Sequence, residues 1–335
     1  MDPLTQGFAG AALPQAAVRR TGAATAGLLG FLAGMAPDLD VLIRSSEDPL
    51  LFLEYHRQFT HSLVIIPFGG ALCALLLHPL LGRRRGLTPL TTWLCCTLGY
   101  ATHALLDACT TYGTQLFWPF SDVRVAWNVV SIIDPLFSLP LALAVGLAAR
   151  TGRRGFAVAG LCWALAYLGL GVLQREQARA LGEALARERG HAPVEVVAKP
   201  GFANILVWKT VYRAEGRFFV DAMRTGWAPL QCPGESLAVL DRARDLPWLD
   251  PASQQARDVE RFRWFSAGYV ALAAPGSDRV IDIRYSLVPN EIDALWSLQL
   301  NRAAEPAAHG AYRVHRGDSQ AALPRLWHLL WAADC

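Results

Sequence analysis

The chain has 335 residues, of which 53% are hydrophobic and 18% are charged, whereas soluble globular proteins average ~25% charged residues. Length alone suggests about two domains. Residues 1–174 contain 20 charged residues, and residues 175–335 contain 39. Because only the second half has the composition of a soluble domain, this distribution excludes a single soluble globule, a disordered tail protein and a disulfide-stapled mini-protein.

Long stretches without charge run through the first half. A helix that crosses ~30 Å of hydrocarbon needs ~20 apolar residues. Three uncharged stretches reach this length, and a fourth reaches it with one acid near its start: 58–82, 86–106, 155–174 and 125–149. Two shorter stretches rich in Gly and Ala, 3–18 and 21–37, predict a tightly packed hairpin of thin spans or a re-entrant pair. We therefore expect a polytopic α-helical membrane domain over residues 1–174, with about 4–6 membrane segments.

The arginines of the first half indicate how this domain is oriented. Three short connections carry basic residues without acidic neighbours, which marks them as cytoplasmic by the positive-inside rule. These residues are Arg19, Arg20, Arg83, Arg84, Arg85, Arg150, Arg153 and Arg154. Alternation of the spans then places the soluble half on the external side. The net charge of +3 needs no nucleic-acid partner, because the basic excess is a topology signal.

Ionisable residues interrupt the apolar sequence at the external ends of neighbouring spans. Such residues at membrane depth normally face a protein interior or a watery cavity and carry function. The set consists of Asp38, Asp40, His56, Arg57, His61, His103, Asp107 and Asp134. Chance would scatter these residues over both faces, so their gathering at one face predicts a site there.

The spacing of this set suits metal binding. His103 and Asp107 stand at i and i+4 and therefore project from one helical face. An imidazole and a carboxylate on one face form a half-site for a divalent metal. Asp38 and Asp40 are two apart, so we expect Pro37 to start an extended turn that presents both.

His56 and His61 are five residues apart, which does not fit one continuous helix. The spacing works if His56 lies in a loop and Thr60 caps a helix that begins at His61, since Thr is a favoured N-cap. We thus predict one or two divalent ions, zinc being the first expectation and manganese or magnesium the alternatives. The predicted ligands are Asp40, His56, His61, His103 and Asp107.

Three further residues have predicted catalytic roles. Asp38 or Asp134 could serve as general base, as could Asp107, and Arg57 could neutralise substrate charge. Asp134 precedes Pro135 and could instead only cap a helix. Residues 110–120 predict an external loop, whose hydroxyls could bind substrate and whose aromatic residues fit a membrane-interface belt better.

Several motifs carry a resemblance to a known family. They are MDPLTQG at 1–7, PDLD at 37–40, HRQFTHS at 56–62, GYATHALLD at 99–107 and TYGTQLFWPF at 111–120. Over about residues 1–150 the chain resembles the YdjM-like family of bacterial inner-membrane proteins, described as membrane-bound metal-dependent hydrolases. The resemblance implies an inner-membrane location and a metal-dependent hydrolase with these His and Asp residues as ligands. Many relatives carry a His in place of Gln6, which here would be a weaker oxygen donor or a substrate contact.

The second half predicts a helix that leaves the membrane and then an α+β domain. Residues 175–190 form the charged connecting helix, and residues 191–335 form the soluble domain. Alternating apolar residues predict two β-hairpins. We expect the hairpins at 204–213 with 217–223 and at 268–273 with 279–288, and a mostly helical segment at 237–266 broken by Pro247 and Pro251.

Neither the cysteines nor the histidines of the soluble half indicate a second metal site. Cys232 and Cys335 are the only two cysteines there, and they could form one disulfide. The histidines show no ligand spacing and are assigned no chemistry: His191, His309, His315 and His328.

Two functions from different classes fit this sequence. The first is an integral-membrane hydrolase whose metal site opens externally and acts on an amphiphilic or lipid-linked ester, a phosphoester being the first expectation. The alternative is a non-catalytic, metal-stabilised membrane scaffold or sensor whose soluble domain recruits a partner. Transport is weaker than either, because the polar residues stop at one face of the membrane domain.

Overall fold

The computed structural model describes residues 1–18, 22–315 and 317–335, so Arg19 and Arg20 of the predicted cytoplasmic set lie outside the described residues. The chain divides into two compact units. The first comprises Met1–Ile43, Tyr55–Val172 and Phe202–Asn204, and the second comprises Arg44–Glu54, Leu173–Gly201 and Ile205–Cys335. The candidate site described below lies entirely within the first unit.

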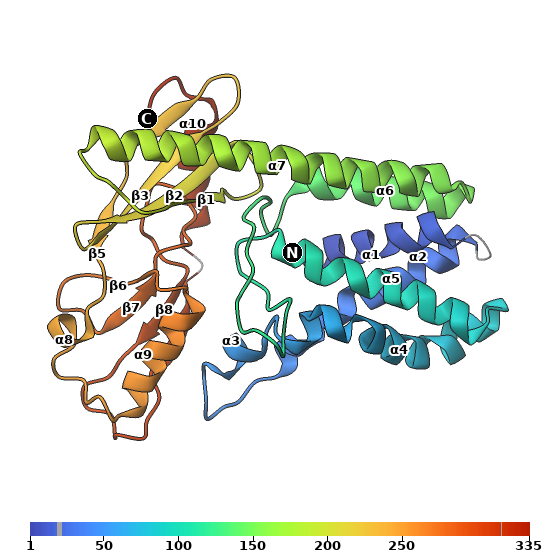
Figure 1. The fold of residues 1–335 in the computed structure, drawn as a ribbon, viewed down its shortest axis with the longest axis horizontal. Helices are drawn as coiled ribbons and strands as arrows, with labels where there is room; N and C mark the ends of the chain where they lie inside the picture. Colours follow the sequence, from blue (N-terminus) through green and yellow to red (C-terminus); the bar gives the residue numbers. More distant parts are fainter. Residues whose placement is uncertain (19–21, 316) are drawn as a thin grey trace. The chain divides into compact units, whose positions relative to one another are not determined.

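The first unit is helical (Figure 1). Its α-helices are α1 (Pro3–Ala17), α2 (Ala23–Met35), α4 (Ile66–Leu77), α5 (Pro89–Ala108), α6 (Pro135–Thr151) and the first part of α7 (Arg154–Glu188). Short 3₁₀ turns connect them: η1 (Ala36–Leu42), η2 (Phe59–His61), η3 (Leu63–Ile65) and η5 (Arg83–Arg85). A π-helical turn, η4 (His78–Gly82), extends α4.

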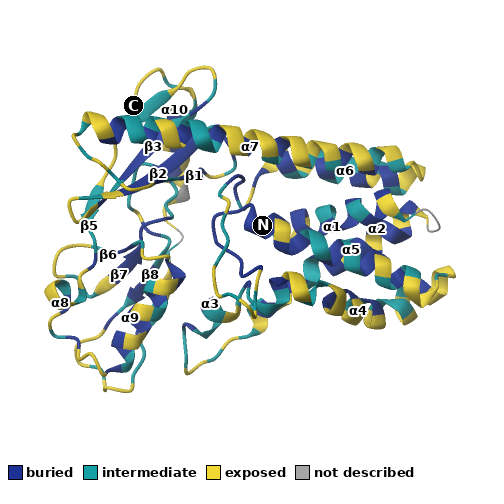
Figure 2. Cartoon of the chain, viewed as in Figure 1, coloured by how far each residue is buried: buried dark blue, intermediate teal, exposed yellow. Residues whose placement is uncertain are grey.

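Within the described residues, three helical segments are long and apolar enough to cross a membrane: Ala23–Leu42, Leu63–Arg85 and Arg154–Glu188. Helix α6 is apolar but shorter. Figure 2 shows many exposed residues along α4, α6 and α7, and large apolar side chains such as Leu75, Leu139 and Leu165 are among them. Exposed apolar surface of this kind is suited to lipid. The predicted helical membrane domain followed by an α+β domain is confirmed.

Three of the predicted spans differ from the expectation. The stretch 125–149 is helical only from Pro135, as the 17-residue helix α6. The stretch 86–106 forms most of the 20-residue helix α5. Helix α5 is not among the segments that qualify by length and apolar composition, because its polar residues lower its hydropathy; these residues turn inward, and α5 packs against α1, α2 and α4. The stretch 21–37 was expected to be a thin span or re-entrant segment. Its helix α2 continues through η1 and reaches 20 residues.

Glycines bring α1, α2 and α5 into backbone contact. A Cβ atom on Gly10 would lie 2.5 Å from the Gly30 carbonyl oxygen, and a Cβ atom on Gly99 would collide with the backbone of Gly30. Gly30 and Gly34 are four residues apart on α2, the small-residue spacing that lets membrane helices approach closely. This contact sets the distance between α2 and the helix that carries His103 and Asp107.

The second unit contains two antiparallel sheets and several helices. The first sheet has the order β1-β2-β3-β4, with β5 also paired to β3, and the second has the order β6-β7-β8-β9. The first-sheet strands are β1 (Val196–Pro200), β2 (Val207–Ala214), β3 (Arg217–Arg224), β4 (Leu230–Cys232) and β5 (Ser236–Ala238). The second-sheet strands are β6 (Val270–Leu272), β7 (Arg279–Asp282), β8 (Trp296–Gln299) and β9 (Ala311–Val314). The helices are α8 (Arg242–Asp245), α9 (Gln254–Phe265) and α10 (Ser319–Trp331), together with all of α3 (Leu51–Tyr55) except Tyr55.

Both predicted hairpins form, as β2 with β3 and β6 with β7. Strand β7 ends at Asp282, short of the predicted 288, because the Asp282 carboxylate accepts hydrogen bonds from the backbone and side chain of Arg284 and turns the chain there. The segment 237–266 is less helical than expected: it begins in β5, and only α8 and α9 are helical. Cys232 and Cys335 form the predicted disulfide.

Candidate metal centre

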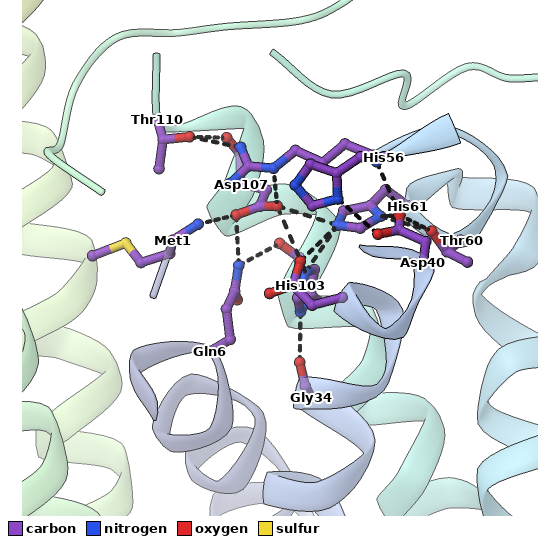
Figure 3. A network of polar contacts seen from close by, with 12 residues as sticks. Met1, Gln6, Gly34, Asp40, His56, Thr60, His61, His103, Asp107 and Thr110 are labelled. Atoms are coloured by element: carbon purple, nitrogen blue, oxygen red, sulfur yellow. Dashed lines mark hydrogen bonds and ion pairs between the residues drawn. The ribbon is translucent and has the colours of Figure 1, made fainter. Parts of the chain in front are cut away.

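Three segments of the first unit bring three of the predicted ligands together with Asp38 (Figure 3). Helix α5 presents His103 and Asp107 from adjacent turns, as their i, i+4 spacing predicts. The turn η1 supplies Asp38, and η2 supplies His61. One ligand atom from each of these four residues lies within 4.8 Å of each of the others.

The closest atoms of this four-residue cluster are imidazole nitrogens and carboxylate oxygens. The Nε2 atoms of His61 and His103 are 2.9 Å apart. Asp107 Oδ2 lies 3.2 Å from His61 Nε2 and 3.6 Å from His103 Nε2. Asp38 Oδ1 lies 3.6 Å and 3.4 Å from the same two nitrogens. Ligands held ~2.0–2.2 Å from a tetrahedral ion are roughly 3.3–3.6 Å from one another. The carboxylate–imidazole separations of 3.2–3.6 Å are close to this range, whereas the 2.9 Å between the two Nε2 atoms is shorter.

Hydrogen bonds fix the direction in which both rings present their lone pairs. His103 Nδ1 donates to the Gly34 carbonyl at 2.6 Å. Thr60 Oγ1 donates to Asp40 Oδ2 at 2.7 Å, so its lone pair accepts from His61 Nδ1 at 2.9 Å. With Nδ1 as the donor, a neutral ring presents the lone pair of Nε2 to the cluster. Two imidazole lone pairs and two carboxylates that face one another suit a cation placed among them.

Asp107 has different surroundings on its two oxygens. Oδ1 accepts from Gln6 Nε2 at 2.7 Å and contacts the Met1 amine. Oδ2 is buried and accepts no hydrogen bond from the residues that the structure describes; Arg57 Nε lies 2.9 Å away but is not aligned to donate. Because Oδ2 is the atom that faces both imidazoles, this buried oxygen is the one that suits an ion. The donor set therefore fits a divalent metal.

A second group shares Asp38 with the first. It consists of Asp38, Asp40 and His56. His56 Nδ1 lies 2.7 Å from Asp40 Oδ1, and Asp40 Oδ2 accepts from the Arg57 backbone N–H at 2.9 Å as well as from Thr60. The oxygens of Asp40 are thus engaged in orienting the loop and His61. Asp38, for which the sequence predicts the role of a base, belongs to the four-residue cluster. Two predicted ligands, Asp40 and His56, lie outside that cluster and next to it.

Arg57 is held inside the protein. Its side chain is buried, and it reaches Asp107 through Nε and Thr110 Oγ1 through a terminal nitrogen at 3.1 Å. Its guanidinium carbon lies 4.8 Å from the centre of the Tyr112 ring, and its backbone has a φ of 63°, a left-handed value that non-glycine residues adopt rarely. These contacts suit a residue that positions Asp107 better than one that meets substrate.

Local structure around the cluster departs from the prediction at two places. Asp38 and Asp40 lie on the 3₁₀ turn η1 and not on an extended turn. The tight 3₁₀ winding directs these two side chains, two residues apart, to different neighbours. Thr60 does not cap a helix that begins at His61. Helix α4 begins at Ile66, where Pro67 fits the first turn since its missing N–H has no partner to lose there.

Asp134 belongs to neither group of possible ligands. It is the N-cap of α6 and accepts from the Phe137 backbone N–H at 3.2 Å. Tyr167 Oη donates to both of its oxygens at 2.9 Å. The helix-capping alternative for Asp134 is therefore the arrangement that the structure shows.

Some residues of the site could not be singled out from the sequence. Gly34 contributes only a backbone carbonyl, and Tyr100 Oη donates to the Thr60 carbonyl at 2.7 Å, which steadies the η2 turn. Gln6 could be singled out from the sequence, because it lies in the opening motif at residues 1–7. Among the described residues, its Oε1 is buried without a hydrogen-bond partner. Figure 3 shows Gln6 and Met1 directed at Asp107.

Comparison with known proteins extends the resemblance of the opening motifs. A family model described as the YdjM inner membrane protein matches residues 1–178. The chain belongs to the YdjM inner membrane protein family. The matched region contains every residue of the four-residue cluster, and membership supports an inner-membrane location.

Two curated relatives show how far the similarity reaches. The uncharacterized protein YfhP of Bacillus subtilis (strain 168) is 24% identical over 269 residues, which cover 77% of this chain and 77% of that protein. The inner membrane protein YbcI of Escherichia coli (strain K12) is 36% identical over 110 residues, which cover 31% of this chain and 60% of that protein. No solved structure matches this chain.

Proposed function

We propose that this YdjM family protein is an integral-membrane, metal-dependent hydrolase. The observation that carries the proposal is the convergence of His61 Nε2, His103 Nε2 and two carboxylate oxygens at 2.9–3.6 Å, with both rings anchored through Nδ1. Zinc suits two imidazoles and carboxylates in this arrangement, and manganese is the next choice. A divalent ion bound there would polarise a scissile ester and acidify a water molecule.

The residues of the cluster divide into holding and reacting roles in this proposal. His61, His103 and Asp107 are fully buried and would hold the ion. The Asp38 side chain is 17% exposed, so it stands at the accessible edge and would accept a proton from water as general base. Arg57 and Gln6 would keep Asp107 in place.

The location of the cluster points to the substrate class. Asp38 lies near the C-terminal end of the membrane segment Ala23–Leu42, and Asp107 lies near the end of α5. A site at the end of apolar helices is reached most directly by a molecule that is itself partly in the membrane. An amphiphilic or lipid-linked phosphoester is the proposed substrate, and the disulfide of the soluble unit supports its placement on the periplasmic side.

Metal analysis of the detergent-purified full chain tests the centre. We expect about one zinc or manganese ion per chain in wild type and a loss of at least tenfold in His103→Ala. His78→Ala is the matched control, because His78 lies in η4 and bonds Thr92 outside the cluster. Wild-type protein that is folded and free of metal would contradict the proposal.

A screen of lipid phosphoesters tests the reaction. Asp38→Asn should lower turnover by at least ~10²-fold, as loss of a general base does, while the bound ion is retained. If wild type binds metal and hydrolyses none of these esters, the alternative of a metal-stabilised scaffold or sensor is favoured. The burial of His61, His103 and Asp107 is the observation consistent with that alternative.

A further inference from the structure

The last helix of the soluble unit, α10, has two apolar faces. Ala322, Leu326 and Leu329 are buried, and Ala322 and Leu329 belong to the core cluster that includes Val207 of β2 and Ala222 of β3. On another face, Leu323, Trp327 and Trp331 are exposed by 54%, 64% and 60%. These three residues are four apart, so they form a continuous line along the helix.

The loop between β3 and β4 adds a further tryptophan to this line. Trp227 is 84% exposed. Trp227 and Trp331 line the same pocket of about 220 Å³, together with Arg224 and Leu206. The surface formed by Trp227, Leu323, Trp327 and Trp331, here called the tryptophan surface, is thus contributed by two segments that meet.

A hydrogen bond fixes this loop to α7, and another fixes it to the residue before β2. The Gly226 N–H donates to Gln177 Oε1 at 2.9 Å, and the Thr225 N–H donates to the Leu206 carbonyl at 2.8 Å. Helix α7 is continuous from Arg154 to Glu188, and its uncharged stretch ends at Gln174. Gln177 therefore lies ~4.5 Å beyond the end of that stretch, at ~1.5 Å per residue.

That distance corresponds to the lipid headgroup region. A bilayer is ~40–45 Å thick with its headgroups and ~30 Å thick without them, which leaves roughly 5–8 Å on each side. A loop bonded to Gln177 is held at this depth. Tryptophan is enriched at this depth because its ring is apolar and its N–H is polar.

The charge beside the pocket is also suited to lipid. The Arg224 guanidinium donates to backbone carbonyls, among them those of Ala228 at 2.9 Å and Ala332 at 2.5 Å. Within the described part of the chain, none of its hydrogen bonds or ion pairs involves a carboxylate. Its positive charge is therefore not neutralised by protein and favours a phosphate group.

We propose that the tryptophan surface lies in the headgroup region of the bilayer and binds phospholipid there. Helix α10 acts as an interfacial helix that packs one face on the sheet and lays the other on the membrane. This role is independent of the metal centre and goes beyond the proposed hydrolase. It gives the soluble unit a second attachment to the membrane besides α7.

Depth-dependent fluorescence quenching tests this placement. The full chain is reconstituted in phosphatidylcholine vesicles that contain a lipid with a nitroxide on either the headgroup or carbon 12 of the acyl chain. The signal of interest is the difference between wild type and Trp227→Phe/Trp331→Phe. We expect the headgroup nitroxide to quench this signal about twofold more than the chain nitroxide, as for an interfacial residue.

Trp163→Phe is the matched control. Trp163 is 39% exposed and lies near the middle of the uncharged stretch of α7, so its signal should show the opposite order of quenching. Quenching of the Trp227 and Trp331 signal by acrylamide alone would place the surface in water and overturn the proposal. Protection from acrylamide and from both lipids would mean that protein covers it. Chain-level quenching like that of Trp163 would contradict the headgroup depth.

Discussion

The Asp40 carboxylate contacts more groups of the site than a metal ligand needs to contact. Its Oδ2 accepts from the Thr60 hydroxyl and the Arg57 N–H, and its Oδ1 lies 2.7 Å from His56 Nδ1. Through Thr60 it also determines which nitrogen of His61 carries the proton. A carboxylate in this position supports a metal-binding histidine without touching the ion.

Asp40→Asn should therefore weaken metal binding without abolishing it. Loss of such a supporting partner typically lowers metal affinity 10–100-fold, less than loss of His103 itself. The measurement is competition with a chelator of known affinity, using detergent-purified protein. Asp48→Asn is the control, since Asp48 pairs with Arg261 in the other unit. An unchanged affinity in Asp40→Asn would show that Asp40 has no such role.

The sequence predicted the residues of this centre better than their roles. His103 and Asp107 follow from a helical spacing that α5 realises directly. The difference between Asp38 and Asp40 depends on the winding of η1 and on Thr60, and two acids two residues apart do not reveal it. The Gly34 carbonyl that orients His103 is invisible in a sequence, because every residue has one.

Among the elements, the contact of α1, α2 and α5 has the most direct effect on the centre. Gly30 has no room for a side chain, since a Cβ atom there would collide with the Gly10 carbonyl oxygen. Four residues later on the same helix, the Gly34 carbonyl accepts a hydrogen bond from His103 Nδ1. The spacing of the helices and the position of an imidazole therefore depend on the same contact.

Gly30→Ala should lower the stability of the first unit by about 1–3 kcal/mol, the usual cost of overpacking, and reduce the metal content. Thermal unfolding and metal analysis of the purified protein measure the two effects. Gly146→Ala is the matched control, because no atom lies within 4 Å of a Cβ at that position of α6; it should leave both unchanged or raise stability slightly. Equal behaviour of the two variants would show that the contact is not tight.

The hydrophobic stretches predict where the helices lie in the chain, but not whether lipid or protein surrounds each helix. The stretch that became α5 was long enough to be taken for a lipid-facing span, yet half of its residues are buried. Proline determines the start of one helix: α4 begins at Ile66, directly before Pro67, and not at the polar motif that precedes it. Burial and helix boundaries of this kind arise from packing between elements, which periodicity within one element does not report.

For the whole molecule, the disulfide between Cys232 and Cys335 bears on the compartment of the soluble unit. The two residues are 103 positions apart and join the chain end to β4. Disulfides persist in oxidising compartments such as the periplasm. Their pairing supports the external orientation that the arginines of the membrane unit suggest.

Thiol counting in acid-quenched cells tests this orientation. After denaturation, a maleimide polymer should modify the five free cysteines, and after reduction all seven. Cys335→Ser should give six modified cysteines under both conditions. Seven reactive thiols before reduction would mean that the pair is reduced in the cell, and would contradict the periplasmic placement.

The burial of the proposed ligands would have a kinetic consequence. His61, His103 and Asp107 have no exposed surface, and Asp38 alone is partly exposed. An ion held by these residues could leave only past Asp38 or after α2 and α5 separate. Exchange with free metal would then be limited by protein motion and not by ligand affinity, so the ion acquired during assembly would persist through later changes in the surrounding metal supply.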